Sequence, residues 1–225
     1  MKQPDQPNQS IFPQKHHEGR MILFVFIVFA FLSAAFVELS EDVISKETLL
    51  WDQGVLLYIN AHSNPVFDRI IPLLTNLGGA LGVTLITLAC LILYYRRKDF
   101  SRFSLLFFTV AGATALNLIL KLVFKRQRPA LWDLLVFEPT FSFPSGHAMA
   151  SSALAFALII ALKNEPYQVP LRVLAMAYIL FIGFTRLYLG VHYPTDILAG
   201  WLVSLAWSLI VMLILNNRLK EDYII

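Results

Sequence analysis

Residues 103–129 read Phe103-Ser-Leu-Leu-Phe-Phe-Thr-Val-Ala-Gly-Ala-Thr-Ala-Leu-Asn-Leu-Ile-Leu-Lys-Leu-Val-Phe-Lys-Arg-Gln-Arg-Pro129. Up to Phe124 this stretch carries a single charged side chain, Lys121, and it then runs into a cluster of cations. About 20 consecutive apolar residues cross the hydrocarbon core of a bilayer as a helix. The stretch therefore predicts a transmembrane helix that delivers positive charge to one membrane surface.

The rest of the chain has the same character. Of its 225 residues, 57% are hydrophobic and 15% are charged, whereas soluble domains carry about 25% charged residues. Backbone polar groups inside a bilayer must be satisfied within the segment, which favours helices. Besides Phe103–Phe124, five runs are candidate spans: Met21–Val37, Leu77–Tyr95, Ala148–Leu162, Leu171–Leu189 and Ile197–Leu215.

We therefore expect an all-α polytopic membrane protein with six transmembrane helices in one bundle over residues 21–217. The run Ala148–Leu162 is short, as for a helix that begins below the membrane surface inside protein. Residues 1–20 are polar and contain three prolines, so we expect a disordered cytoplasmic tail. Residues 218–225 form a short cytoplasmic C-terminal tail in this prediction.

The segment Trp51–Pro72 has a mixed composition. Apolar Val55 and Leu56 alternate with polar Asp52 and Asn60. This pattern predicts one or two amphipathic helices that lie at the membrane interface, between the first and second spans.

Loop charges predict the topology. Eleven Lys and Arg residues lie on the side of the termini and seven on the other side, and an excess of Lys and Arg marks the cytoplasmic side. Both termini are thus expected in the cytoplasm. Four of the seven outer cations cluster at the end of the third span. The rule that sets the topology does not explain a positive cluster on the outer side, so we expect it to have a function.

Three polar segments fall on that outer side. The first is Lys121 to Pro129, the second is Pro144-Ser145-Gly146-His147, and the third is Thr185-Arg186-Leu-Tyr-Leu-Gly-Val-His192-Tyr-Pro-Thr-Asp196. Polar groups at membrane depth are costly and usually functional. The topology therefore predicts that these segments converge on one site.

The cations of these segments suit a phosphoryl group. Lys121, Arg128 and Arg186 can stabilise the negative charge that spreads over its oxygens during transfer. If one helix continues to Pro129, Lys121 and Arg128 share a face two turns apart. Lys125 and Arg126 at the helix end have a simpler interpretation, because such side chains often extend to lipid head groups.

The segment Pro144–His147 precedes the fourth span. A glycine turn that feeds a helix exposes backbone N–H groups to an anion. Ser145 can add its hydroxyl, the Gly146 N–H can donate, and His147 stands in the first turn. A simple helix cap with an incidental histidine is the alternative for this segment taken alone.

His192 and Asp196 are spaced i, i+4. If the sixth span begins near Tyr193, Asp196 can accept a proton from one nitrogen of His192 and leave the other free as a nucleophile. A metal site is the rival interpretation, but the sequence has no Glu-x-x-His or His-x-x-x-His pair and the nearby cations would repel a divalent ion. Nothing resembles a nucleic-acid surface, and the single cysteine, Cys90, excludes an intrachain disulfide.

The three segments resemble the signature of the type 2 phosphatidic acid phosphatase family of integral membrane lipid phosphatases. That signature is Lys-x6-Arg-Pro, Pro-Ser-Gly-His and Ser-Arg-x5-His-x3-Asp, and the resemblance covers roughly Trp51 to Leu215. Thr185 departs from the pattern, which has Ser there, although threonine keeps the hydroxyl.

The resemblance implies a role for each matched residue. His192 would attack phosphorus to form a phosphohistidine, Asp196 would orient His192, and His147 would protonate the leaving oxygen and then activate water. The phosphate oxygens would be held by a further set: Lys121, Arg128, Ser145, Gly146 and Arg186. No metal and no organic cofactor is implied.

The resemblance also implies the substrate class and the location. A bacterial inner-membrane enzyme with an outward-facing site would act on phosphatidylglycerophosphate, phosphatidic acid or undecaprenyl pyrophosphate. Lys125 and Arg126 could bind the second phosphate of a pyrophosphate, and Trp132, Asp133 and Glu138 could influence head-group choice. A lipid phosphotransferase using the same phosphohistidine is the alternative. A membrane lipid is the expected partner, and the oligomeric state is open, with a monomer favoured.

Overall fold

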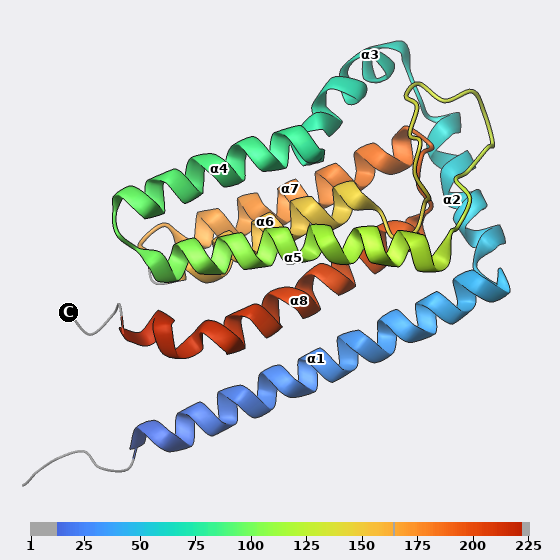
Figure 1. Ribbon diagram of the computed structural model, residues 1–225. Coiled ribbons are helices and arrows are strands. Elements are labelled where there is room, and N and C mark those ends of the chain that lie inside the picture. The colour runs from blue at the N-terminus through green and yellow to red at the C-terminus, as the bar shows by residue number, and fades with distance from the viewer. Residues whose placement is uncertain (1–12, 164, 222–225) are drawn as a thin grey trace, which may run out of the picture.

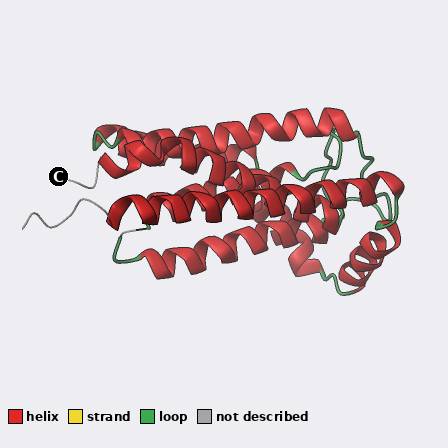
Figure 2. Ribbon diagram, turned by 90° about the horizontal axis from the view of Figure 1, so that it is seen from below, coloured by secondary structure: helices red, strands yellow, loops and turns green. Residues whose placement is uncertain are grey.

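The computed structural model describes residues 13–163 and 165–221, and these residues are helical throughout, apart from turns and loops (Figures 1 and 2). The chain order is α1 (Pro13–Ser45), α2 (Leu49–Ala61), α3 (Pro65–Leu74), the 3-10 helix η1 (Thr75–Gly78), α4 (Ala80–Arg96), α5 (Phe100–Phe124), α6 (Gly146–Ala161), α7 (Gln168–Tyr188) and α8 (Pro194–Glu221).

The predicted spans correspond, in order, to α1, α4, α5, α6, α7 and α8. Among the described residues, four helical segments are long and apolar enough to cross a membrane alone: Ile22–Ser45, Phe100–Phe124, Gln168–Tyr188 and Pro194–Leu215. The pair Pro65–Gly78 and Ala80–Arg96 qualifies together, with a bend of 43°. The chain is thus a helical membrane protein with four to five spans by length and composition, and the count of six stays a prediction.

Helix α6 lies in the middle of the bundle, against α5, α7 and α8. It is short but almost entirely buried, and Ala148, Ala153 and Ala157 are fully inaccessible. Small side chains let neighbouring helices approach closely. A Cβ on Gly200 of α8, for example, would lie 3.2 Å from the Cβ of Ala148. Since its surroundings are protein, α6 need not match the full thickness of a bilayer.

Helix α1 packs along α8 at the edge of the bundle. Its other faces are apolar and open, with Phe24 66% and Phe31 70% exposed. Such a surface fits contact with lipid chains. The helix begins at Pro13, inside the segment 1–20 that was expected to be disordered, and residues 1–12 lie outside the described part of the chain. At the other end α8 continues to Glu221, into the expected tail 218–225, of which residues 222–225 lie outside the described part.

Helices α2 and α3 lie together at one end of the bundle, where they turn away from the direction of the long helices (Figure 1). They occupy the segment that was expected to lie at the membrane interface, and that location stays a prediction. Leu56 and Asp52 of α2 are both fully buried. The loop between α5 and α6 lies at this same end, whereas α1 begins and α8 ends at the opposite end (Figure 1).

Candidate active site

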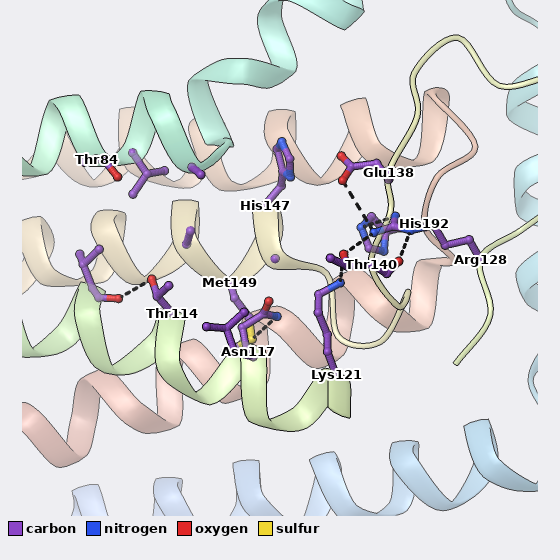
Figure 3. A pocket seen from close by; sticks show the side chains of 16 residues that line it. Thr84, Thr114, Asn117, Lys121, Arg128, Glu138, Thr140, His147, Met149 and His192 are labelled. Carbon is purple, nitrogen blue, oxygen red and sulfur yellow. Dashed lines mark hydrogen bonds and ion pairs between the residues drawn. The ribbon is translucent and has the colours of Figure 1, made fainter. Parts of the chain in front are cut away.

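A cavity of about 250 Å³ lies between α4, α5 and α6 and reaches the loop that follows α5 (Figure 3). Val83, Val110 and Leu118 give it apolar walls in the depth of the bundle, and Arg128 and His192 line its outer end. The cavity therefore joins an apolar channel to a charged pocket, as a phosphorylated amphiphile would require. Five of the candidate residues line it: Lys121, Arg128, Gly146, His147 and His192.

Lys121 and Arg128 meet at Thr140 of the loop (Figure 3). Lys121 Nζ donates to Thr140 Oγ1 at 3.2 Å and to the Phe141 carbonyl. Arg128 Nε donates to the Thr140 carbonyl at 2.7 Å, and its Nη1 donates to the Val191 carbonyl at 2.7 Å. The loop thus holds both cations at the outer end of the cavity.

The expectation that Lys121 and Arg128 share one helix is wrong. Helix α5 ends at Phe124, and Lys125 adopts a left-handed conformation with φ of 46°. A left-handed residue is a common way to end a helix, and here it does so before Pro129 is reached. Arg128 therefore comes back to Lys121 through the folding of the loop and not through helix periodicity.

Arg186 lies in the last turn of α7 with 1% of its side chain exposed. Its Nη1 donates to Thr75 Oγ1 at 2.9 Å, and its Nη2 donates to the Glu138 carboxylate, which also lies 3.8 Å from Arg128. Burial alone would raise the pKa of Glu138, but the charges of Arg186, His147 and Arg128 outweigh it and lower this pKa. Arg186 Nε is buried without a hydrogen-bond partner in the described part of the chain.

Hydrogen bonds hold the turn before α6 in place. Ser145 is the N-cap residue of α6, its Oγ accepts from Ala148 N at 3.4 Å, and its own N–H donates to the Asp196 carbonyl at 3.0 Å. Asn117 Nδ2 donates to the Pro144 carbonyl at 3.0 Å. A Cβ on Gly146 would lie 3.1 Å from Asn117 Oδ1, so glycine allows the close approach of α5.

His147 projects from the first turn of α6 into the cavity (Figure 3). Its imidazole makes no hydrogen bond within residues 13–163 and 165–221. The ring lies against the start of α4, where a Cβ on Gly79 would come within 2.9 Å of Nε2. Nε2 therefore packs against Gly79, and the ring as a whole lines the cavity.

His192 and Asp196 are in contact, with 3.3 Å between Nδ1 and Oδ2. The other nitrogen, Nε2, lies 3.1 Å from Arg128 Nη1. A guanidinium can only donate hydrogen bonds, so Nε2 is the acceptor and Nδ1 carries the proton. Burial, followed by the charges of Arg128, Arg186 and Lys121, lowers the pKa of His192 well below its ordinary value. The geometry thus describes a neutral imidazole whose lone pair faces the cations.

Asp196 is fully buried in the first turn of α8. Its Oδ2 accepts from the Ser142 hydroxyl and from Tyr193 N at 2.8 Å, while Oδ1 accepts from Arg126 Nη1 at 2.6 Å. The carboxylate that faces His192 is therefore fixed from three other directions. Helix α8 begins at Pro194, three residues before the predicted run Ile197–Leu215, so the condition for contact between His192 and Asp196 is met.

A family model agrees with this arrangement of motifs. The model of the PAP2 superfamily matches residues 102–220. The chain belongs to the PAP2 superfamily. The matched segment contains every candidate catalytic and phosphate-binding residue named above.

Individual proteins also resemble the chain over most of its length. It is 30% identical to phosphatidylglycerophosphatase B of Bacillus subtilis (strain 168), over 82% of this chain and 88% of that protein. It is 27% identical to undecaprenyl-diphosphatase BcrC of the same strain, over 64% of this chain and 73% of that protein. The crystal structure of a PAP2-type phosphatidylglycerolphosphate phosphatase from Bacillus subtilis matches with a TM-score of 0.73 at 24% identity, over 84% of this chain and 96% of that one.

Asp52 and Ser142 of this PAP2 site were not identified from the sequence, and Glu138 was expected only to influence head-group choice. Arg126 was expected at the lipid surface or on a second phosphate, but its guanidinium points inward to Asp52 and Asp196. The signal that could have found Asp52 is a carboxylate within an otherwise apolar turn of α2. The described residues contain no group of three or more His, Cys, Asp or Glu side chains placed to hold a metal ion.

Proposed function

We propose that this PAP2 protein is an integral membrane lipid phosphatase that acts through a phosphohistidine formed on His192. One observation carries the proposal. Asp196 holds the Nδ1 side of the ring at 3.3 Å, so the Nε2 lone pair faces a pocket of cations at the end of an apolar-walled cavity. A carboxylate-oriented imidazole is the arrangement that nucleophilic catalysis needs.

The first step transfers the phosphoryl group to the enzyme. His192 Nε2 attacks phosphorus in line, and the bond from phosphorus to the lipid oxygen breaks. His147 takes up a proton when the phosphate anion binds beside it, and it gives that proton to the leaving lipid oxygen. The phosphorylated ring is positively charged, and Asp196 stabilises that charge. Arg128 now contacts Nε2 at 3.1 Å, so its guanidinium must turn to a phosphate oxygen as the substrate enters.

The second step returns the enzyme to its starting state. Neutral His147 takes a proton from a water molecule as that water attacks phosphorus. The bond between nitrogen and phosphorus breaks, its electron pair returns to Nε2, and inorganic phosphate leaves. His147 is again protonated, and His192 is again neutral. No metal ion enters either step.

The phosphate oxygens are bound by Lys121, Arg128, Arg186 and the turn at Ser145 and Gly146 in this proposal. In the free site, Glu138 pairs with the guanidiniums of Arg128 and Arg186. An entering phosphate would replace the Glu138 carboxylate in these contacts. The unpaired Nε of Arg186 supplies a further donor. Fixed donors of this kind stabilise the transition state more than they stabilise the bound substrate.

The substrate in this proposal is a lipid phosphate monoester or pyrophosphate. Phosphatidylglycerophosphate, phosphatidic acid and undecaprenyl pyrophosphate are the candidates, and relatives are named for the first and the last of these. The protein would reside in the bacterial inner membrane with both termini in the cytoplasm. Its site would face the periplasmic or extracellular side.

Phosphate release from these three lipids in liposomes, with excess EDTA present, tests the proposal. Wild type should release phosphate despite EDTA, and His192→Ala should lose at least about 1,000-fold of the rate, as removal of a nucleophile does in other covalent enzymes. Loss of wild-type activity in EDTA would contradict the metal-independent mechanism. Phosphate that appears only on an added acceptor, as seen by thin-layer separation of products, would indicate the phosphotransferase alternative.

A further inference from the structure

Arg126 lies between two carboxylates that are both fully buried. Its Nη1 is 2.6 Å from Asp196 Oδ1, and its Nη2 is 2.7 Å from Asp52 Oδ2. The guanidinium also lies over the Tyr193 ring, with 4.1 Å from Cζ to the ring centroid. Charge-assisted bonds at these distances are among the strong ones in proteins.

Asp52 contacts the same turn of α8 directly. Its Oδ1 accepts from Thr195 N at 3.0 Å, and its Oδ2 accepts from Thr195 Oγ1 at 2.7 Å. Arg126 Nη1 donates to that hydroxyl as well, at 2.7 Å. Asp52 and Arg126 therefore hold Thr195 and Asp196 together, although one residue comes from α2 and the other from the loop after α5.

One cation lies between two carboxylates in this part of the site. From the neutral His192 outward the order is Asp196, Arg126 and Asp52. Two buried carboxylates close together would repel each other strongly without the cation between them. Both also lie in the first turn of a helix, where the positive end of the dipole favours them. Removal of Arg126 would therefore destabilise both carboxylates in their present positions.

Arg126 does not line the cavity that carries the catalytic candidates. It lines a separate cavity of about 420 Å³ on the other side of the network, together with Lys46, Lys125 and Tyr193. Both terminal nitrogens of its guanidinium, Nη1 and Nη2, donate hydrogen bonds to other residues of the protein. Among the catalytic candidates, the guanidinium of Arg126 is hydrogen-bonded to Asp196.

We propose that the Asp52–Arg126 ion pair is a positioning pair for the His192–Asp196 dyad, and that it makes the dyad depend on the placement of α2. This inference rests on the proposed function, since it concerns the geometry of the nucleophile. Arg126 and Asp52 touch no reacting atom. They set the position of the Asp196 carboxylate, which in turn sets the direction of the Nε2 lone pair.

The expected kinetic effect falls on kcat. Arg126→Ala should lower kcat by about 10- to 100-fold, the range seen when a group that orients a functional imidazole is lost. KM should stay within about 3-fold, because the phosphate-binding cations remain. Asp52→Asn should be milder, since Arg126 still reaches Asp196. The double variant should be less impaired than Arg126→Ala alone, because no unpaired second carboxylate is left in the interior.

Chemical rescue separates positioning from general structure. The cavity of about 420 Å³ beside Arg126 gives methylguanidinium a route to the space that Arg126→Ala vacates. Millimolar methylguanidinium should restore part of kcat in Arg126→Ala and should leave wild type unchanged. Arg69→Ala is the matched control, because Arg69 is exposed on α3 near the same end of the bundle, and its kcat should equal that of wild type.

Active sites are counted by trapping the phosphorylated enzyme from radiolabelled lipid, so that rates are compared per functional site. Reduced labelling with a normal rate per site would show a merely structural role and overturn the inference, as would a raised KM with unchanged kcat. If Arg126→Ala does not fold, an Asp52→Asn variant with wild-type kcat per site would also overturn it. Inactive wild type would refute the proposed function itself, whereas active wild type with unimpaired Arg126→Ala refutes this inference alone.

Discussion

The two ring nitrogens of His192 have different neighbours, and this difference determines what the ring can do. Nδ1 faces Asp196, which can accept a proton, and Nε2 faces Arg128, which can only donate one. The neutral ring therefore has a single tautomer compatible with both contacts. The sequence could predict the spacing of His192 and Asp196, but it could not predict that Arg128 would reach the lone pair from a loop.

The acid limb of the pH profile should report on His192. Burial and then Arg128 lower its pKa, and only the neutral ring can attack, so activity is lost as the pH falls through the lowered pKa. That limb should lie below the ordinary histidine value of about 6.5. The folded protein also binds fewer protons than the unfolded chain below that pH, so its stability should fall as the pH is lowered.

Replacement of Arg128 tests whether its charge lowers the pKa of His192. In Arg128→Gln this charge is gone, so the pKa of His192 should rise. The acid limb of kcat/KM should then move to higher pH, although the rate itself is reduced. Single-turnover rates of wild type and variant on one lipid are compared across the acidic range, so that ionisation of the substrate cancels. An unmoved limb, or one moved to lower pH, would contradict the assignment.

At the scale of elements, the apolar runs predicted where the helices lie because membrane helices must satisfy their own backbone. The apolar run Phe103–Phe124 ends where α5 ends. It could not predict that Lys125 adopts a left-handed conformation, so that the helix does not continue to Pro129. The physical reason lies in tertiary structure: Arg126 is bound by carboxylates from α2 and α8, which are distant in sequence.

The junction between α7 and α8 depends on Gly190. Its φ is +66°, and a Cβ there would lie 2.4 Å from Trp132 Cζ2. Gly190→Ala should lower the free energy of unfolding by at least about 1–2 kcal/mol, the cost of a left-handed alanine. It should also lower kcat, because His192 follows two residues later. Thermal unfolding in detergent measures the first effect and phosphate release measures the second.

Gly54→Ala is the matched control for this prediction. Gly54 lies within α2, and nothing comes within 4 Å of a Cβ placed there. Alanine is about 1 kcal/mol more favourable than glycine inside a helix, so the control should keep or raise the unfolding temperature. Equal unfolding temperatures for the two variants would show that neither the backbone conformation nor the contact with Trp132 constrains this junction.

At the scale of the whole molecule, the three polar segments of the sequence gather at one end of the bundle and both ends of the described chain lie at the other (Figure 1). Topology alone could predict this, because an odd number of crossings separates the N-terminus from each segment. It could not predict the contribution of α2. That helix lies outside the three motifs, and Asp52 is brought to the site only by tertiary packing.

The orientation of the molecule in the membrane is the remaining prediction at this scale. Loop charges predict that the termini lie in the cytoplasm, so the loop between α2 and α3 should face outward and the loop between α4 and α5 inward. Ser63 and Arg97 are exposed in these two loops, and each is replaced by cysteine in a Cys90→Ala background. A membrane-impermeant maleimide should label Ser63→Cys in intact spheroplasts, and Arg97→Cys only after permeabilisation. The reverse pattern would place the candidate site in the cytoplasm, and labelling of both in intact spheroplasts would mean that a membrane does not separate the two ends of the bundle.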